Sequence, residues 1–166
     1  MRIDNPKAMT VEEMRAERDK PVAQGARLVF TSGCFDILHR WHAADLTFAS
    51  KRGDALAVGL NADVSVKANK GEDRLINSEQ DRAFVLGPLR AADFVVLFGD
   101  KEPRDIIAKF LPKVLVKGSD WAHYVSGCEA VEANGGRVVV ADMVEGRSTT
   151  NTIQRILQVH AKDETA

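Results

Sequence analysis

The sequence predicts an α/β domain built on a five-stranded parallel sheet, doubly wound and Rossmann-like. Short apolar, β-branched runs alternate along the chain with segments of helical periodicity. Such alternation is typical of a parallel sheet covered by helices on both faces. The runs are also almost continuously apolar, as expected for strands buried on both sides. The length of 166 residues suits a single domain with a full core.

The chain begins with a charged leader, which we expect to span residues 1–25. Thr10-Val11-Glu12-Glu13 has the spacing of a capping box, which predicts a short helix that ends before Pro21. We expect this helix to pack on the outside of the domain. The domain itself is then expected over residues 26–160, with a C-terminal tail at residues 161–166.

The elements of the domain follow in order after the leader. Strands are expected at residues 27–31, 55–60, 94–98, 114–117 and 137–140. Helices are expected at residues 43–52, 79–89, 103–110, 126–134 and about 150–159. Ser78 is suited to cap a helix, Pro103 fits a first turn, and Gly135-Gly136 is typical of a helix stop. We expect the polar stretch 61–78 to be a long loop, either a binding loop or merely solvated.

Composition excludes several functional classes. A formal net charge of −1 gives no global attraction to nucleic acid or a membrane surface. Cys34 and Cys128 fit no zinc spacing, so reduced thiols are expected. No apolar run approaches the roughly 20 residues of a membrane helix, and the N-terminus lacks the apolar core of a signal peptide. We therefore expect a cytoplasmic protein with no nucleic-acid or membrane partner.

A pair of histidines lies where the first domain strand gives way to a helix. His39 and His42 follow Gly33-Cys34-Phe35-Asp36 at a spacing that brings both imidazoles to one helix face. In open α/β sheets, such strand ends bind phosphates. Imidazoles and backbone N–H groups can stabilise charge on a transferring phosphate. Asp36 fits either an indirect metal contact or a helix cap.

Three further segments indicate phosphate binding at the same sheet edge. Ser148, Thr149 and Thr150 precede the last helix and exceed what capping alone requires. Lys117, in Val-Lys-Gly-Ser-Asp-Trp, ends a strand and faces the expected crevice. Arg82 lies near a helix start, where an anionic partner or a surface salt bridge would explain it.

Taken together, the chain resembles the cytidylyltransferase-like nucleotidyltransferases over residues 10–158, and among them most of all the D-glycero-β-D-manno-heptose 1-phosphate adenylyltransferases. In bifunctional relatives this unit is fused behind a sugar kinase. The motifs that carry the resemblance are Phe-Thr-Ser-Gly-Cys-Phe-Asp-Ile-Leu-His, Gly-Leu-Asn-Ala-Asp, Lys-Gly-Glu-Asp-Arg, Val-Lys-Gly-Ser-Asp, Ala-Asn-Gly-Gly and Glu-Gly-Arg-Ser-Thr-Thr-Asn. The chain departs from the family at Trp41, which replaces the glycine of His-x-Gly-His, and at Ser32, Leu75 and Ile153.

The resemblance implies a reaction in which a sugar 1-phosphate attacks the α-phosphorus of ATP, assisted by Mg²⁺, to give an ADP-sugar and pyrophosphate. It implies a homodimer and no covalent intermediate, and it leaves the metal ligands unassigned. Catalytic roles are implied for His39, His42, Lys70 and Lys117. Nucleotide contacts are implied for Thr31, Ser32, Gly33, Cys34, Phe35, His42, Ser148, Thr149 and Thr150. Contacts to the sugar phosphate are implied for Asp36, Asn61, Asp63, Arg82 and Asp120.

Two alternatives remain open from the sequence. The first is a cytidylyltransferase acting on glycerol phosphate or another polyol phosphate, because the groups that select the base are not evident in the sequence. The second is a catalytically weak paralogue that binds nucleotide as a regulatory or partner subunit. Trp41 is the residue that supports it, because the glycine it replaces allows close approach of backbone to the nucleotide.

Overall fold

A computed structural model describes residues 5–20, 25–71, 74–119, 123–142 and 146–160. These residues form one parallel sheet, as predicted, but with six strands rather than five. The strands are β1 (Ala8–Met9), β2 (Leu28–Gly33), β3 (Ala55–Asn61), β4 (Phe94–Phe98), β5 (Val114–Gly118) and β6 (Arg137–Ala141). The count was wrong because β1 has only two residues, too few to give a periodic signal, and it pairs with β4 at the edge of the sheet.

Seven helices accompany these strands in the described part of the chain. They are α1 (Val11–Arg18), α2 (Arg40–Ser50), α3 (Asp63–Lys70), α4 (Glu79–Leu86), α5 (Arg104–Phe110), α6 (Cys128–Ala133) and α7 (Thr149–His160). The predicted capping box of α1 and the Ser78 cap of α4 are both confirmed. Pro103 occupies the cap position of α5 rather than its first turn.

The prediction of an unbroken loop over 61–78 was wrong, because α3 lies within it. Its sequence, Asp-Val-Ser-Val-Lys-Ala-Asn-Lys, mixes five poorer helix formers with two lysines and one alanine, so propensity alone did not predict a helix. The helix is fixed instead by tertiary contacts. Ser65 Oγ donates to the carbonyl of Asp100 at 2.7 Å and accepts from Asn61 Nδ2 at 2.9 Å. Val66 is buried beside them, with 1% of its surface exposed.

The order of the strands fixes where a ligand can bind. Across the sheet the order is β1-β4-β3-β2-β5-β6, with all pairs parallel. The chain thus winds outward in one direction from β2 to β4, then in the other from β5 to β6. The switch between the two directions lies between β2 and β5. In open α/β sheets, ligands bind outside the carboxyl ends of strands at such a switch point.

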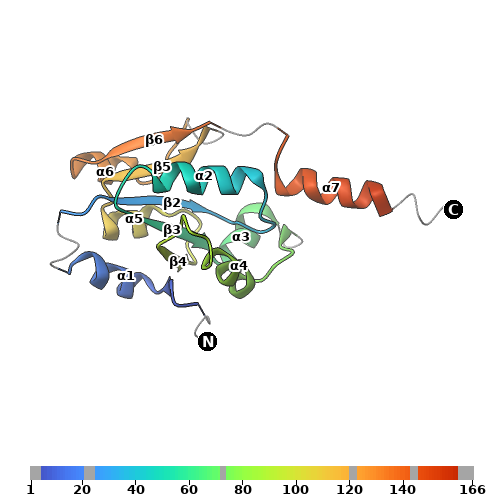
Figure 1. The fold of residues 1–166 in the computed structure, drawn as a ribbon, viewed down its shortest axis with the longest axis horizontal. Helices are drawn as coiled ribbons and strands as arrows, with labels where there is room; N and C mark the ends of the chain where they lie inside the picture. Colours follow the sequence, from blue (N-terminus) through green and yellow to red (C-terminus); the bar gives the residue numbers. More distant parts are fainter. Residues whose placement is uncertain (1–4, 21–24, 72–73, 120–122, 143–145, 161–166) are drawn as a thin grey trace.

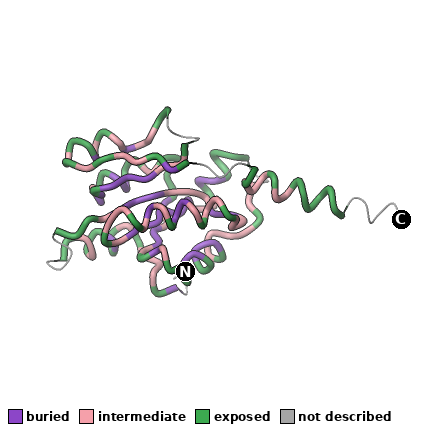
Figure 2. Tube along the Cα trace, turned by 45° about the horizontal axis from the view of Figure 1, so that its top comes forward, coloured by how far each residue is buried: buried purple, intermediate pink, exposed green. Residues whose placement is uncertain are grey.

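Helices cover both faces of the sheet, which confirms the doubly wound prediction (Figure 1). On one face, α2 and α4 bury residues such as Leu46 and Leu86 against the strands. On the other face, α1, α5 and α6 bury Met14, Ile107 and Val131. The leader therefore contributes to the core through α1 as well as to the sheet through β1. Buried residues follow the strands through the middle of the molecule (Figure 2).

The last helix, α7, extends away from the body of the domain (Figure 1). None of its described side chains is buried, and Ile156 and Leu157 expose 49% and 63% of their surface. Only its first turn lies near the sheet edge that carries the histidines. Among the described helices, none is both long enough and apolar enough to cross a membrane.

Candidate active site

The turn from β2 into α2 has an unusual backbone, and Phe35 is its key residue. Its φ is +47°, in the left-handed region that an aromatic residue rarely adopts. Such a conformation costs about 1–3 kcal/mol and persists only where the surroundings enforce it. The Phe35 ring is buried, and a Cβ at Gly33 would lie 3.1 Å from Phe35 Cε2. Gly33 therefore allows the ring to fold back beneath the end of the strand.

This turn brings the two histidines together at the start of α2. His39 occupies the helix cap position with an extended backbone, and its side chain makes no capping hydrogen bond. The imidazoles of His39 and His42 are stacked, with ring centroids 3.9 Å apart and planes at 19°. The Phe35 ring also contacts the His42 ring, with ring centroids 5.1 Å apart. In His39, Nδ1 is buried without a hydrogen-bond partner among the described residues, whereas His42 interacts with the backbone of Ile37.

The surroundings of the two imidazoles favour their neutral form. Burial lowers the pKa of His39. Burial, followed by the charges of His39 and Lys70, lowers the pKa of His42 to about 4. At pH 7 both rings are therefore neutral, and each can donate one N–H hydrogen bond. A nearby phosphate would raise both pKa values, because an anion stabilises the protonated ring.

His42 lines a cavity of about 460 Å³ at the carboxyl ends of the strands, beside the switch point. Segments far apart in the sequence contribute to its wall, from the end of β2 to the first residue of α7. The lining residues are Ser32, Gly33, Cys34, Phe35, Asp36, Trp41, His42, Asp45, Asn61, Val66, Asn69, Lys70, Arg74, Lys101, Glu102, Pro103, Lys117, Gly118, Tyr124, Ser126 and Thr149. The Trp41 indole is partly buried against the core and lines this cavity, so it does not turn outward.

Lys117 spans the switch point from β5 to β2. Its Nζ donates to the carbonyl and to Oγ of Ser32, both at 3.2 Å. Thr31, one residue earlier, is buried and donates from Oγ1 to the Asp45 carboxylate at 3.3 Å. Thr31 therefore ties β2 to α2 behind the cavity, whereas Ser32 and Lys117 form part of its wall.

Ser148, Thr149 and Thr150 have different roles in the structure. Ser148 Oγ accepts from the backbone N–H of Asn151 at 3.1 Å, as an ordinary helix cap does. Thr149 lines the cavity. Thr150 Oγ1 accepts from Arg74 Nη2 at 3.0 Å, which ties α7 to the segment before α4. Ser148 alone caps the helix, so Thr149 and Thr150 are the hydroxyl residues that capping does not require.

Arg74 is a cavity residue to which the sequence reasoning assigned no role. Its Nε is buried and has no hydrogen-bond partner among the described residues. A buried guanidinium donor without a partner is costly and suits an anionic ligand. The signal available in the sequence was the Lys-Gly-Glu-Asp-Arg motif, from which only Lys70 was assigned.

Arg82 and Asp63 do not line the cavity. The Arg82 side chain is fully buried, and its Nη2 donates to Asp63 Oδ1 at 2.7 Å. Its other nitrogens donate to the carbonyls of Cys34 and Asn77. Arg82 thus braces the turn after β2 from below and presents no group to a ligand in this arrangement.

Asp36 and Asn61 line the cavity but are already engaged. The Asp36 carboxylate accepts from the backbone N–H groups of Ile76 and Asn77 at 2.9–3.2 Å, so it caps the segment before α4 rather than α2. Asn61 donates to Ser65. Asp120 lies outside the described residues. Within the described ranges, no three His, Cys, Asp or Glu side chains are grouped so that they could hold a metal ion.

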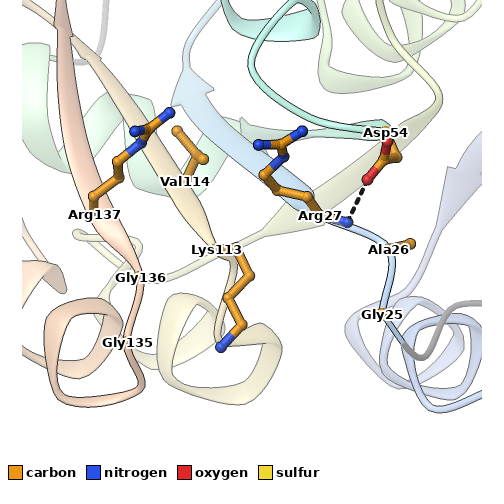
Figure 3. A pocket seen from close by; sticks show the side chains of 9 residues that line it. All are labelled: Gly25, Ala26, Arg27, Asp54, Lys113, Val114, Gly135, Gly136 and Arg137. Atoms are coloured by element: carbon orange, nitrogen blue, oxygen red, sulfur yellow. Dashed lines mark hydrogen bonds between the residues drawn. The ribbon is translucent and has the colours of Figure 1, made fainter.

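A second, shallower hollow of about 530 Å³ lies at the opposite, amino-terminal edge of the strands (Figure 3). Arg27, Lys113 and Arg137 line it together with Asp54, which accepts from the Arg27 backbone N–H at 2.7 Å. In Figure 3 Lys113 points away from the two guanidinium groups, and its Nζ donates to the carbonyl of Asn134. These cations do not converge, and all are exposed, so the cavity at the histidines is the better candidate despite its smaller volume.

Comparison with known proteins gives a family match and a set of relatives. The family described as cytidylyltransferase-like matches residues 30–160. The bifunctional protein HldE of Azorhizobium caulinodans is 47% identical over 134 residues, which cover 80% of this chain and 28% of that protein. The bifunctional protein HldE of Gluconacetobacter diazotrophicus is 48% identical over 142 residues, covering 85% and 29%. The chain thus spans less than a third of the length of these curated relatives.

Solved structures with a similar fold are more distant in sequence. The lipopolysaccharide core biosynthesis protein from Thermoplasma volcanium has a TM-score of 0.58 and 23% identity, over 72% of this chain and 98% of that one. Pantoate-beta-alanine ligase from Francisella tularensis has a TM-score of 0.62 and 12% identity, over 86% and 68%. At these identities the two structures support the Rossmann-like fold alone.

Proposed function

This chain belongs to the cytidylyltransferase-like family of nucleotidyltransferases, and from that premise we propose that it transfers AMP from ATP to D-glycero-β-D-manno-heptose 1-phosphate, releasing pyrophosphate. The observation that carries the proposal is the stacked His39–His42 pair at the switch point, with His42 in the wall of a cavity that Lys70, Arg74 and Lys117 also line. Such a set of donors fits several phosphate groups held close together.

In the proposed reaction, an oxygen of the sugar phosphate forms a bond to the α-phosphorus of ATP. The bond between that phosphorus and the oxygen bridging to the β-phosphate breaks, and the electron pair leaves with pyrophosphate. Negative charge is therefore redistributed over phosphate oxygens, and the protein has to position them and stabilise that charge. No covalent intermediate is needed, so Cys34 has no nucleophilic role in this proposal.

The two histidines suit this task because they are neutral donors beside cations. A neutral imidazole in a partly buried site donates a strong hydrogen bond to a phosphate oxygen. As charge develops at the α-phosphate, the ring becomes easier to protonate, and stabilisation increases in the transition state. We assign His42 to the α-phosphate and His39 to support and orientation of His42 through stacking.

The β- and γ-phosphates are proposed to lie between α3 and the start of α7. Lys70, Arg74 and Thr149 all line the cavity, and Arg74 also donates to Thr150 at the start of α7. The partnerless Nε of Arg74 would gain an acceptor there. Mg²⁺ bound to the triphosphate would neutralise part of its charge. The described residues offer no cluster of metal ligands, so we assign no protein ligand to the ion.

The choice of ATP and heptose 1-phosphate rests on two supports. The ordered motifs resemble those of the heptose 1-phosphate adenylyltransferases, and the chain is 44–48% identical to one segment of the bifunctional HldE proteins. Use of CTP with glycerol 3-phosphate is the nearest alternative. The weakly active paralogue is the second alternative, and the observation behind it is that Trp41 and His42 line the same cavity.

The test is a screen for pyrophosphate release with ATP or CTP, each paired with heptose 1-phosphate or glycerol 3-phosphate. We expect turnover with ATP and heptose 1-phosphate, loss of it in His42→Ala, and retention in the control His160→Ala, which alters an exposed histidine at the far end of α7. Turnover with CTP and glycerol 3-phosphate would replace the proposal by its alternative. Nucleotide binding without turnover on any pair would favour the paralogue.

We also propose a homodimer that works in the cytoplasm. Exposed Ile156 and Leu157 on α7 support self-association, because a single domain rarely leaves such a helix uncovered. A cytoplasmic location agrees with ATP as donor and with two free cysteines. The domain limits at residues 26 and 160 are part of the same proposal. Light scattering on the purified chain tests the dimer.

A further inference from the structure

The cavity reaches across the carboxyl edge of the sheet, from the helices of one face to those of the other. His42 belongs to α2, on the first face. Glu102 precedes α5, and Tyr124 and Ser126 precede α6, both helices of the second face. All three residues line the same cavity as His42. The proposed transfer uses the histidine end only, so the other end has no assigned role.

Hydrogen bonds organise this second end. Glu102 Oε2 accepts from Ser126 Oγ at 2.9 Å and from Tyr124 Oη at 3.1 Å. Arg104 Nη2 donates to Tyr124 Oη at 3.1 Å and pairs with Glu129 at 3.6 Å. These bonds join the segment after β4 to the segment after β5. They also orient the carboxylate, and Glu102 Oε1 accepts no hydrogen bond from the described residues.

The chemistry of this end differs from that of the phosphate end. Hydrogen bonds from Ser126 and Tyr124 lower the pKa of Glu102, so its carboxylate is ionised at neutral pH. An ionised carboxylate accepts hydrogen bonds and donates none. It therefore binds hydroxyl groups well and disfavours direct contact with phosphate oxygens. Tyr124, with 42% of its surface exposed, adds an aromatic face.

We propose that Glu102, oriented by Tyr124 and Ser126, selects the acceptor by binding sugar hydroxyl groups remote from its phosphate. This inference rests on the proposed function. It assigns to Glu102, Tyr124 and Ser126 the discrimination between a polyhydroxylated sugar phosphate and a short polyol phosphate. With the acceptor phosphate held near His42, the hydroxyl-bearing end of the sugar points along the cavity toward α5 and α6. The nucleotide then contacts the α2 and α7 side and makes no contact with Glu102.

The experiment is steady-state kinetics of pyrophosphate release with ATP and heptose 1-phosphate, for the wild type, Glu102→Gln and Tyr124→Phe. Glu102→Gln keeps shape and removes the charge, and Glu129→Gln is its matched control, since Glu129 contacts Arg104 but does not line the cavity. We expect Glu102→Gln to raise the KM for heptose 1-phosphate roughly 10- to 100-fold, the range for a hydrogen bond to a charged group. Tyr124→Phe should raise it roughly two- to tenfold. The KM for ATP should stay unchanged in both, and Glu129→Gln should match the wild type.

Two kinds of failure are distinguishable. If the wild type turns over and Glu102→Gln keeps its KM for heptose 1-phosphate, or raises the KM for ATP instead, the acceptor role of Glu102 is refuted while the proposed function stands. If the wild type uses glycerol 3-phosphate as well as heptose 1-phosphate, the wall does not select sugars and the inference falls. If the wild type transfers to no sugar phosphate, the proposed function fails first and this inference with it.

Discussion

The partly buried imidazole of His42 should make the stability of the protein depend on pH in a defined window. Its pKa in the folded chain is about 4, against 6.5 in an exposed histidine. Below pH 6.5 the unfolded chain takes up a proton at this position and the folded chain does not. Stability attributable to His42 is therefore complete above pH 6.5 and falls as the pH drops toward 4.

The size of the effect follows from the two pKa values. Each pH unit inside the window changes the free energy of unfolding by about 1.4 kcal/mol for one proton. Between pH 7.5 and pH 4.5, His42 should account for a loss of about 2.5 kcal/mol. This is a large share of the total for a domain whose stability is of the order of 5–15 kcal/mol.

The assay compares urea unfolding of the wild type and His42→Gln at pH 7.5, 6.0 and 4.5, followed by circular dichroism. Glutamine keeps a hydrogen-bond donor but does not titrate, so the carboxylates common to both proteins cancel in the difference. We expect the wild type to lose about 2–3 kcal/mol more than His42→Gln over this range. His160→Gln, altered in an exposed histidine, should follow the wild type. Parallel curves for the wild type and His42→Gln would refute the burial of this ring.

Three further outcomes are expected. His42→Ala should lower kcat for pyrophosphate release about 10²–10³-fold, the scale for one transition-state donor; a folded variant with most of its activity would contradict the assignment. Arg82→Met should lower the free energy of unfolding by about 3–5 kcal/mol, because Asp63 and the carbonyl of Cys34 lose their buried partner; a change confined to KM would instead support a ligand role. Trp41→Gly should tighten binding of a non-hydrolysable ATP analogue roughly tenfold, about 1.4 kcal/mol, measured calorimetrically; an unchanged Kd would mean that the indole does not obstruct the nucleotide.

The fold could be predicted from the sequence wherever periodicity was long enough to detect. Continuous apolar runs identified β2 to β6, and capping chemistry located the starts of α1 and α4. The two errors share a cause. β1 is stabilised by pairing with β4, and α3 by the hydrogen bond from Ser65 to the distant carbonyl of Asp100. β1 has only two residues, and α3 contains several residues of poor helix propensity, so neither gave a clear local signal. Tertiary contacts of this kind leave no trace in a single sequence.

The site was predictable in position but only partly in detail. His42, Lys70, Lys117 and Thr149 were expected at one sheet edge, and all four line one cavity. Motif reasoning cannot separate a residue that faces a ligand from one that supports it, because both are charged and lie in the same segments. Arg82 is buried as a brace, whereas Arg74, eight positions earlier, lines the cavity with a buried nitrogen that has no partner.

Phe35 has a consequence for how this site can vary. Its left-handed backbone favours glycine, while the space beneath the strand end is filled by an aromatic ring in contact with His42. Glycine at position 35 would remove the backbone strain but leave a cavity where the ring lies. A β-branched residue there would neither adopt this backbone easily nor fill the space of the ring. The ring in turn crowds a side chain at position 33, where a Cβ would lie 3.1 Å from Phe35 Cε2. Positions 33 and 35 are therefore coupled, and in a mutational scan the effect of a side chain at position 33 should depend on the residue at position 35.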